Sequence, residues 1–109
     1  METKGQYELI VTIVNRGDAE DVVSAAKSAG AEGSTIINAR GTGIHENISF
    51  FGVTIEPEKE IILTMIRKDI SENVMAAIVK AGKLNLPGKG IAFSLDVEKV
   101  AGVAHICKD

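Results

Sequence analysis

The sequence of 109 residues predicts an α+β domain, in which a four-stranded antiparallel sheet carries two helices on one face. A strand–helix–strand order occurs twice, over residues 7–40 and 60–97, and an Ala-Gly dipeptide closes each helix. The first strand of each half is also rich in β-branched residues on both of its faces, as expected for the two strands at the centre of a sheet. The β-α-β-β-α-β order with right-handed crossovers is the ferredoxin-like arrangement, and we expect it to form one domain over 1–109.

In the first half, residues 7–14 alternate between two apolar faces and predict a strand. A turn follows, and Asp18 is expected to cap a helix over 19–29, where apolar residues recur at helical spacing. Gly30 provides the C-terminal stop of that helix. A second strand is expected over 33–40, and a polar loop follows it.

In the second half, residues 50–55 alternate and residues 60–66 are again β-branched, with Pro57 between them. Because proline interrupts a strand ladder, this segment is either one long bent strand or two short ones. Helical spacing then predicts a helix over 70–81, and clean alternation predicts a half-buried strand over 91–97.

The two apolar faces of the central strands cannot both be covered by the two helices. We expect the helices to cover the face that carries Leu9, Val11 and Ile13, with Ile91, Phe93, Leu95 and Val97 also directed inward. The opposite face would then expose Ile10, Val14, Ile62 and Ile66. A second copy of the chain is the economical cover for these residues, and the alternative is a sheet that tolerates a few exposed β-branched side chains.

Composition excludes several classes of protein. The net charge of −3 and the pI near 5.4 argue against a nucleic-acid partner, which needs a positive surface. The single cysteine, Cys107, cannot form an internal disulfide, and the N-terminal residues lack the apolar stretch of a signal peptide, so a cytoplasmic location is expected. The longest apolar run, residues 61–66, is far too short to insert across a membrane.

Signatures of chemistry are sparse. No nucleophile, base and orienting group can be named together, so we expect a protein that is not an enzyme. His45, His105 and Cys107 are weak candidates for metal ligands, against the alternatives of a solvated loop and a frayed C-terminal segment. The alternating acids Glu56, Glu58 and Glu60 are interpreted as a solvated strand edge, with a cation site as the alternative.

Two glycine-rich loops are more informative. The first contains Arg40, Gly41 and Gly43, and the second runs from Gly82 to Gly90 and contains Lys83 and Lys89. Such loops expose backbone N–H groups, and the lysines add positive charge, so an anion cradle is plausible. Neither loop matches a P-loop or a dinucleotide-binding pattern, and each on its own is more often a turn.

The second loop and the strand after it carry a resemblance to a known family. Gly82-Lys-Leu, Pro-Gly-Lys-Gly-Ile-Ala-Phe and Leu-Asp-Val-Glu-Lys-Val100 resemble the B-loop and following strand of PII nitrogen-regulatory proteins. Arg40-Gly-Thr-Gly43 resembles the K-G-F-G motif at the base of their T-loop, and the whole resemblance covers about residues 7–100. It implies a homotrimeric signal-transduction protein that binds adenine nucleotides in clefts between subunits and acts on a partner protein through the T-loop.

The resemblance also implies a set of ligand-binding positions. These are Arg40, Gly41, Gly43, Gly82, Lys83, Gly88 and Lys89. The chain departs from the family in a T-loop shortened to six residues between Gly43 and Phe50, without a tyrosine for nucleotidylation. His45 stands in place of a ligand-holding glutamine, Glu58 falls near a phosphate-binding lysine, and Gly102 and Ala104 replace two arginines. These replacements predict weakened binding of ATP.

From these observations we expect a PII-like regulator that binds a small anionic metabolite or an adenine nucleotide between subunits. Two alternatives remain at this point. One is a structural or docking trimer with empty clefts, and the other is a metal-binding module. Nucleotide titration separates the first alternative from the leading hypothesis, and the metal content of the purified protein tests the second.

Overall fold

A computed structural model of the protein describes residues 2–42 and 48–102. Its main sheet has the order β2-β5-β1-β6, and every neighbouring pair is antiparallel. The four strands are β1 (Glu2–Asn15), β2 (Thr35–Arg40), β5 (Glu58–Arg67) and β6 (Gly90–Ala101). The predicted ferredoxin-like fold is confirmed, with the two strands that are apolar on both faces at the centre of the sheet.

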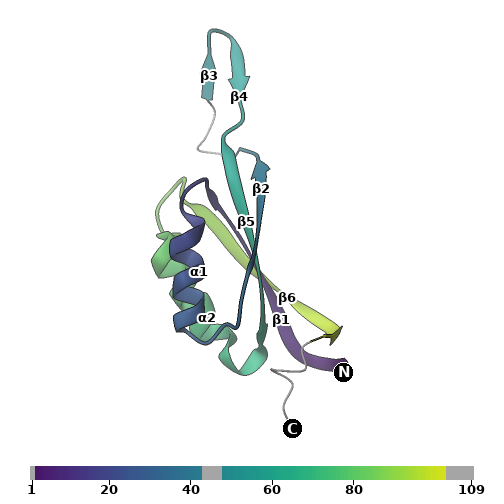
Figure 1. The fold of residues 1–109 in the computed structure, drawn as a ribbon. Helices are drawn as coiled ribbons and strands as arrows, with labels where there is room; N and C mark the ends of the chain where they lie inside the picture. Colours follow the sequence, from purple (N-terminus) through teal and green to yellow (C-terminus); the bar gives the residue numbers. More distant parts are fainter. Residues whose placement is uncertain (1, 43–47, 103–109) are drawn as a thin grey trace.

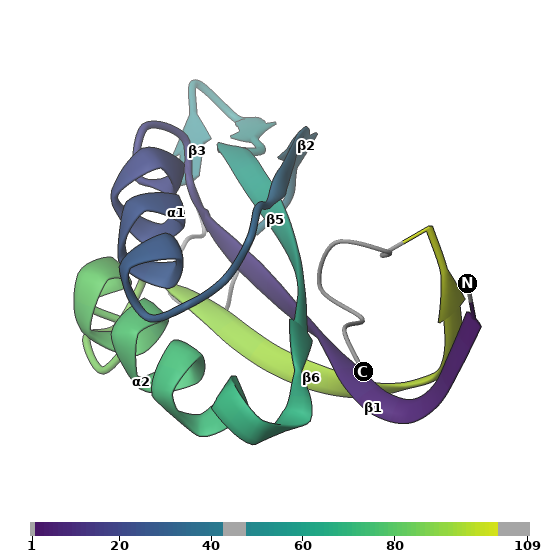
Figure 2. The same cartoon turned by 60° about the horizontal axis from the view of Figure 1, so that its bottom comes forward.

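Both helices lie on one face of this sheet (Figures 1 and 2). They are α1 (Ala19–Ser28) and α2 (Ser71–Gly82), and a short 3-10 helix, η1 (Lys68–Ile70), precedes α2. Each crossover therefore packs its helix on the same side, which leaves the other side without a helix among the described residues. No helix in the described ranges is long and apolar enough to span a membrane.

The prediction of which face the helices cover is wrong. The helices pack on Ile10, Val14, Ile62 and Ile66, whose side chains are at most 2% exposed. The helix side chains that complete this core are Ala19, Val22, Ala26, Val74 and Ile78. Strand alternation divides the residues of a strand between two faces, but here both faces are apolar, so the pattern does not show which face the helices cover. The turns that lead into the helices determine this.

The opposite side of the sheet, here called the open face, is apolar as well. Each residue of β1 on this face lies between one partner on β5 and one on β6, so that the apolar residues form three rows across the sheet. On β1, β5 and β6, these three rows of the open face consist of Leu9, Val11, Ile13, Ile61, Leu63, Met65, Ile91, Phe93 and Leu95. All nine are half-buried or exposed, and Leu95 is 51% exposed, whereas it was expected to point inward.

Between β2 and β5 the chain forms a second, two-stranded sheet that projects past the end of the main one (Figure 1). It consists of β3 (Ile48–Phe50) and β4 (Val53–Ile55). Phe51 and Gly52 join these strands with φ angles of 52° and 77°, the two positive values that a type I′ hairpin turn requires. The predicted strand over 50–55 is therefore a turn and a short strand, and Pro57 separates β4 from β5 as expected.

Glu60 stabilises the start of α1 in place of Asp18. Glu60 Oε1 accepts hydrogen bonds from the backbone N–H groups of Gly17 and Ala19, at 2.9 and 3.2 Å, while Asp18 makes no side-chain cap bond. Glu58 forms an ion pair with Arg16. The interpretation of these acidic residues as a strand edge is wrong, because β5 lies between β2 and β1. Glu58 is exposed, in agreement with a solvated side chain, whereas Glu60 is only partly exposed.

Candidate functional site

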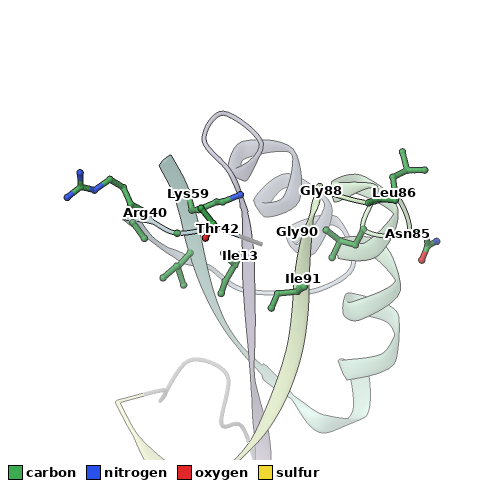
Figure 3. Close-up of a pocket in the computed structure, with 14 residues that line it drawn as sticks. Ile13, Arg40, Thr42, Lys59, Asn85, Leu86, Gly88, Gly90 and Ile91 are labelled. Atoms are coloured by element: carbon green, nitrogen blue, oxygen red, sulfur yellow. The ribbon is translucent and has the colours of Figure 1, made fainter. Parts of the chain in front are cut away.

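A cavity of about 630 Å³ lies at one end of the open face (Figure 3). Its walls come from the end of β2, the start of β5 and the loop over residues 83–89, which joins α2 to β6. The described lining residues are Ile13, Ala39, Arg40, Gly41, Thr42, Lys59, Ile61, Leu84, Asn85, Leu86, Pro87, Gly88, Gly90 and Ile91. Three of them, Ile13, Ile61 and Ile91, also belong to the open face, so the cavity and this face are continuous.

Glycines at the two ends of the 83–89 loop hold it close to the sheet. Gly82 ends α2 where a Cβ atom would lie 3.0 Å from the side chain of Leu84. At the other end, a Cβ atom on Gly90 would lie 2.3 Å from the carbonyl oxygen of Ile13, which no side chain can tolerate. The loop therefore enters β6 in direct contact with β1, and this contact places its residues over the cavity.

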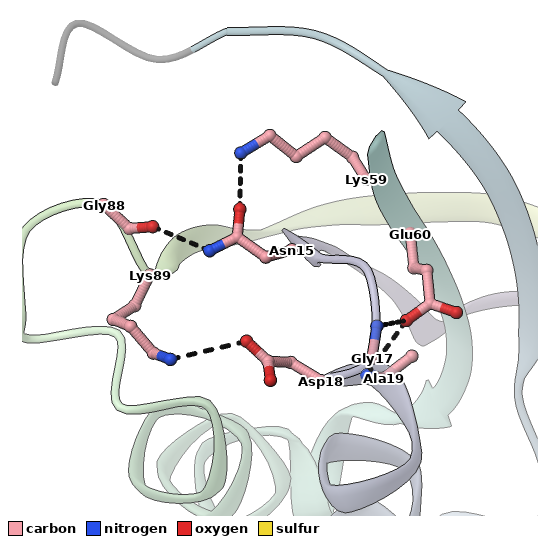
Figure 4. A network of polar contacts seen from close by, with 8 residues as sticks. All are labelled: Asn15, Gly17, Asp18, Ala19, Lys59, Glu60, Gly88 and Lys89. Carbon is pink, nitrogen blue, oxygen red and sulfur yellow. Dashed lines mark hydrogen bonds and ion pairs between the residues drawn. The ribbon is translucent and has the colours of Figure 1, made fainter. Parts of the chain in front are cut away.

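A chain of hydrogen bonds connects β5, β1 and the loop (Figure 4). Lys59 Nζ donates to Asn15 Oδ1 at 2.6 Å, and Asn15 Nδ2 donates to the carbonyl oxygen of Gly88 at 3.0 Å. Asn15 and Lys59 are direct cross-strand partners, so the sheet register brings these two side chains together. Lys59 is only 9% exposed, and Figure 4 shows its ammonium group beside Asn15.

Lys89, the last residue of the loop, is directed away from this chain of hydrogen bonds. Its Nζ lies 3.4 Å from Oδ2 of Asp18, and about one third of each side chain is exposed. Figure 4 shows the pair on the helix side of Asn15. Lys89 is therefore not part of the cavity wall, although its neighbours Gly88 and Gly90 are.

The cavity combines apolar walls with positive charge. Arg40 and Lys59 are its two cationic lining residues, and none of the described lining residues is acidic. Figure 3 shows the guanidinium of Arg40 extending away from the other lining residues, whereas Lys59 lies among them. An anion that also carries apolar atoms fits such a site, because the lysine attracts its charge and the isoleucines contact its apolar part.

The residues predicted to bind a ligand fall into three groups. Arg40, Gly41 and Gly88 line the cavity. Gly82 is buried in the last turn of α2, and Lys83 and Lys89 lie beside the cavity without lining it. Gly43 lies outside the described residues, and so do His45, His105 and Cys107, the weak candidates for metal ligands. Within the described ranges, no group of three or more His, Cys, Asp or Glu residues could hold a metal ion.

The sequence analysis missed Asn15 and Lys59. Asn15 was read only as part of a turn, and Lys59 was hidden among the glutamates that flank it. Strand alternation could have identified Lys59, because it places this residue on the opposite face from Glu58 and Glu60 and on the same face as Ile61.

The comparisons with known proteins agree with the observed fold. The model of the family described as nitrogen regulatory protein P-II matches residues 7–105. Among solved structures, the chain is similar to the crystal structure of Arabidopsis thaliana PII bound to citrate, with a TM-score of 0.71 and 24% sequence identity. That alignment covers 91% of this chain and 84% of the Arabidopsis chain, a likeness of fold. A search of curated proteins found no match.

Proposed function

The chain belongs to the nitrogen regulatory protein P-II family, and on this premise we propose that it is a regulatory protein that binds a small anionic ligand in the cavity. Ligand binding would then change how the protein contacts a partner protein. The proposal is for a signalling role in the cytoplasm, without a catalytic step.

One observation carries the proposal. The 83–89 loop forms part of the wall of an apolar cavity that is also lined by Lys59, a residue only 9% exposed, and none of the described lining residues is acidic. Lys59 donates a hydrogen bond to Asn15. An anionic ligand in the cavity would add a charge-assisted contact to the same ammonium group.

The chemistry of the cavity favours a small carboxylate or an adenine nucleotide with few phosphates. The Arabidopsis protein has been crystallised with citrate, which supports a carboxylate as one class to test. An adenine ring would suit the apolar walls formed by Ile13, Ile61 and Leu84. Because Gly102 stands where one of the two arginines implied by the resemblance would be, we expect little preference for ATP over AMP.

The open face supports assembly into a homotrimer. It presents nine apolar side chains in adjoining rows, a contiguous exposure that soluble monomers rarely tolerate. The rows run into the cavity through Ile13, Ile61 and Ile91, so a neighbouring copy that covers the open face also reaches the cavity. The binding site would then be completed between subunits.

The test is a calorimetric titration of the purified protein with citrate, AMP and ATP, each with and without magnesium. We expect binding of at least one of these probes, with affinities for AMP and ATP within about tenfold of each other. Lys59→Met should weaken binding by about ten- to a hundredfold, the range expected for one charge-assisted hydrogen bond. Lys83→Met, which removes a lysine outside the cavity wall, is the matched control and should leave binding unchanged.

Circular dichroism of Lys59→Met establishes that the variant is folded before its affinity is interpreted. Tight, magnesium-dependent ATP binding that survives Lys59→Met would place the anion elsewhere. If none of the probes binds, the docking trimer with empty clefts would be favoured. The contacts of the 83–89 loop with Asn15 and Asp18 would then hold the loop in place without a ligand.

A further inference from the structure

The carboxylate of Asp18 does not cap α1, although Asp18 directly precedes this helix. It precedes Ala19, the first residue of α1, where aspartate ordinarily accepts a hydrogen bond from the next helical turn. Here its backbone is in the αR region with φ −96° and ψ −7°, and Glu60 accepts the hydrogen bonds from the first backbone N–H groups. The Asp18 carboxylate is thereby available to Lys89, 71 residues later in the chain.

Lys89 is the last residue of the 83–89 loop, and both of its neighbours in the sequence line the cavity. Gly88 and Gly90 on either side have φ angles of 79° and 138° and both line the cavity. The ammonium of Lys89 is paired with Asp18 at 3.4 Å, on the other side of Asn15 from Lys59 (Figure 4). The side chain is about one third exposed, so a change of rotamer would not have to open the core.

We propose that Asp18 is a specificity-determining residue that competes with the ligand for Lys89. This inference rests on the proposed function, because it concerns the same cavity. While Lys89 is paired with Asp18, an anion in the cavity is attracted only by the cationic residues that line the cavity. An additional phosphate on the ligand adds little affinity. Its attraction to Lys89 is offset by the loss of the Asp18–Lys89 ion pair and by repulsion from the carboxylate of Asp18.

The proposal makes Asp18 responsible for weak discrimination between AMP and ATP. Removing its charge leaves Lys89 without a competing anion, and the lysine becomes free to contact the outer phosphates. The effect on affinity is limited by the strength of a partly exposed ion pair, which corresponds to at most about a two- to fivefold change. ATP should benefit more than AMP, because its phosphate chain is longer and carries more negative charge.

The experiment is a calorimetric double-mutant cycle on the full chain at low salt, with AMP and ATP as probes. Asp18→Asn should bind ATP about two- to fivefold more tightly than wild type, with a smaller change for AMP. Lys89→Met alone should change ATP affinity little, and Asp18→Asn combined with Lys89→Met should return affinity to the level of Lys89→Met. Such non-additivity is the signature of two groups that act on one another.

Glu20→Gln is the matched control, since it removes one negative charge from the first turn of α1 at an exposed position. It should leave both affinities at the level of wild type, because the high dielectric constant of water around an exposed carboxylate weakens its interaction with the ligand. The inference is overturned if Asp18→Asn and Glu20→Gln behave alike, or if the gain persists in the Lys89→Met background. If neither wild type nor Asp18→Asn binds either nucleotide or citrate, the proposed function fails and this inference fails with it.

Discussion

Oε1 of Glu60 lies 2.9 Å from the backbone nitrogen of Gly17, so a side chain from β5 holds the turn that leads into α1. Glu60→Ala removes this acceptor and leaves the N–H groups of Gly17 and Ala19 to water. We expect a loss of about 1–2 kcal/mol in the free energy of unfolding, the usual range for a helix cap. Urea denaturation of the purified variant measures it.

The control for Glu60 is its neighbour Glu58, whose ion pair with Arg16 is largely exposed. Glu58→Ala should cost less than about 1 kcal/mol, because exposed ion pairs contribute little. Equal losses from both substitutions would contradict the assignment of Glu60 as the cap.

The two faces of the sheet should respond differently to an introduced charge. Ile62 is fully buried beneath the helices, so Ile62→Lys should prevent folding, because it places an ammonium group in the core. Phe93 is 41% exposed on the open face, so Phe93→Lys should leave the subunit folded and dissociate the proposed trimer. Circular dichroism and light scattering distinguish these two outcomes.

Ser94→Lys provides the control for Phe93→Lys, because Ser94 is exposed on the same strand but belongs to the opposite set of the alternation. It should keep the oligomeric state of the wild type. A Phe93→Lys variant that remains assembled would show that copies of the chain do not meet through the open face.

Replacing glycine by alanine should reduce stability far more at Gly90, where the 83–89 loop enters β6, than at Gly88 within the loop. Gly90→Ala places a Cβ atom 2.3 Å from the carbonyl oxygen of Ile13, at a φ of 138°. Combining overpacking with backbone strain, we expect a loss of about 3 kcal/mol or more in stability. At Gly88 no atom lies within 4 Å of the added Cβ, so Gly88→Ala should cost about 1–2 kcal/mol, from backbone strain alone. Thermal unfolding of the two variants gives the comparison, and a smaller loss at Gly90 would be inconsistent with the close approach to β1.

The hairpin of β3 and β4 offers a test of local stability. Phe51 is 91% exposed with a φ of 52°, a conformation that asparagine adopts more easily than phenylalanine or valine. Phe51→Asn should therefore slow amide hydrogen exchange over residues 48–55, and Phe51→Val should accelerate it. Neither substitution should shift the global unfolding free energy by more than about 0.5 kcal/mol, as expected for an exposed site. Faster exchange in Phe51→Asn than in wild type would contradict the type I′ turn.

The order of the elements was predictable because it depends on local patterns. Alternation and β-branched residues identified β1 and β5, and helical spacing between glycine stops identified α1 and α2. The side of the sheet that the helices cover was not predictable in the same way. Ile10 and Leu9 are equally apolar, and only the path of the turn from Asn15 to Ala19 decides which of them is buried.

The site was only partly accessible from the sequence. Arg40, Gly41 and Gly88, which belong to the glycine-rich loops, line the cavity, and their role in ligand binding stays a prediction. Asn15 and Lys59 are 44 residues apart, and their contact depends on the register between β1 and β5. The pairing of Lys89 with Asp18 depends further on Glu60 taking over the cap of α1, a relation between three separate segments that no local pattern contains.

The position of β1 between β5 and β6 also determines when the chain can fold. Within residues 2–42 and 48–102, β1 has no backbone pairing with β2, the strand nearest to it in sequence, and pairs only with residues 59–67 and 90–101. During synthesis at about 5–20 residues per second, the first forty residues therefore emerge without any strand partner. The central strand of the sheet stays exposed on the ribosome for several seconds, and the cooperative folding step waits until β6 has left the exit tunnel.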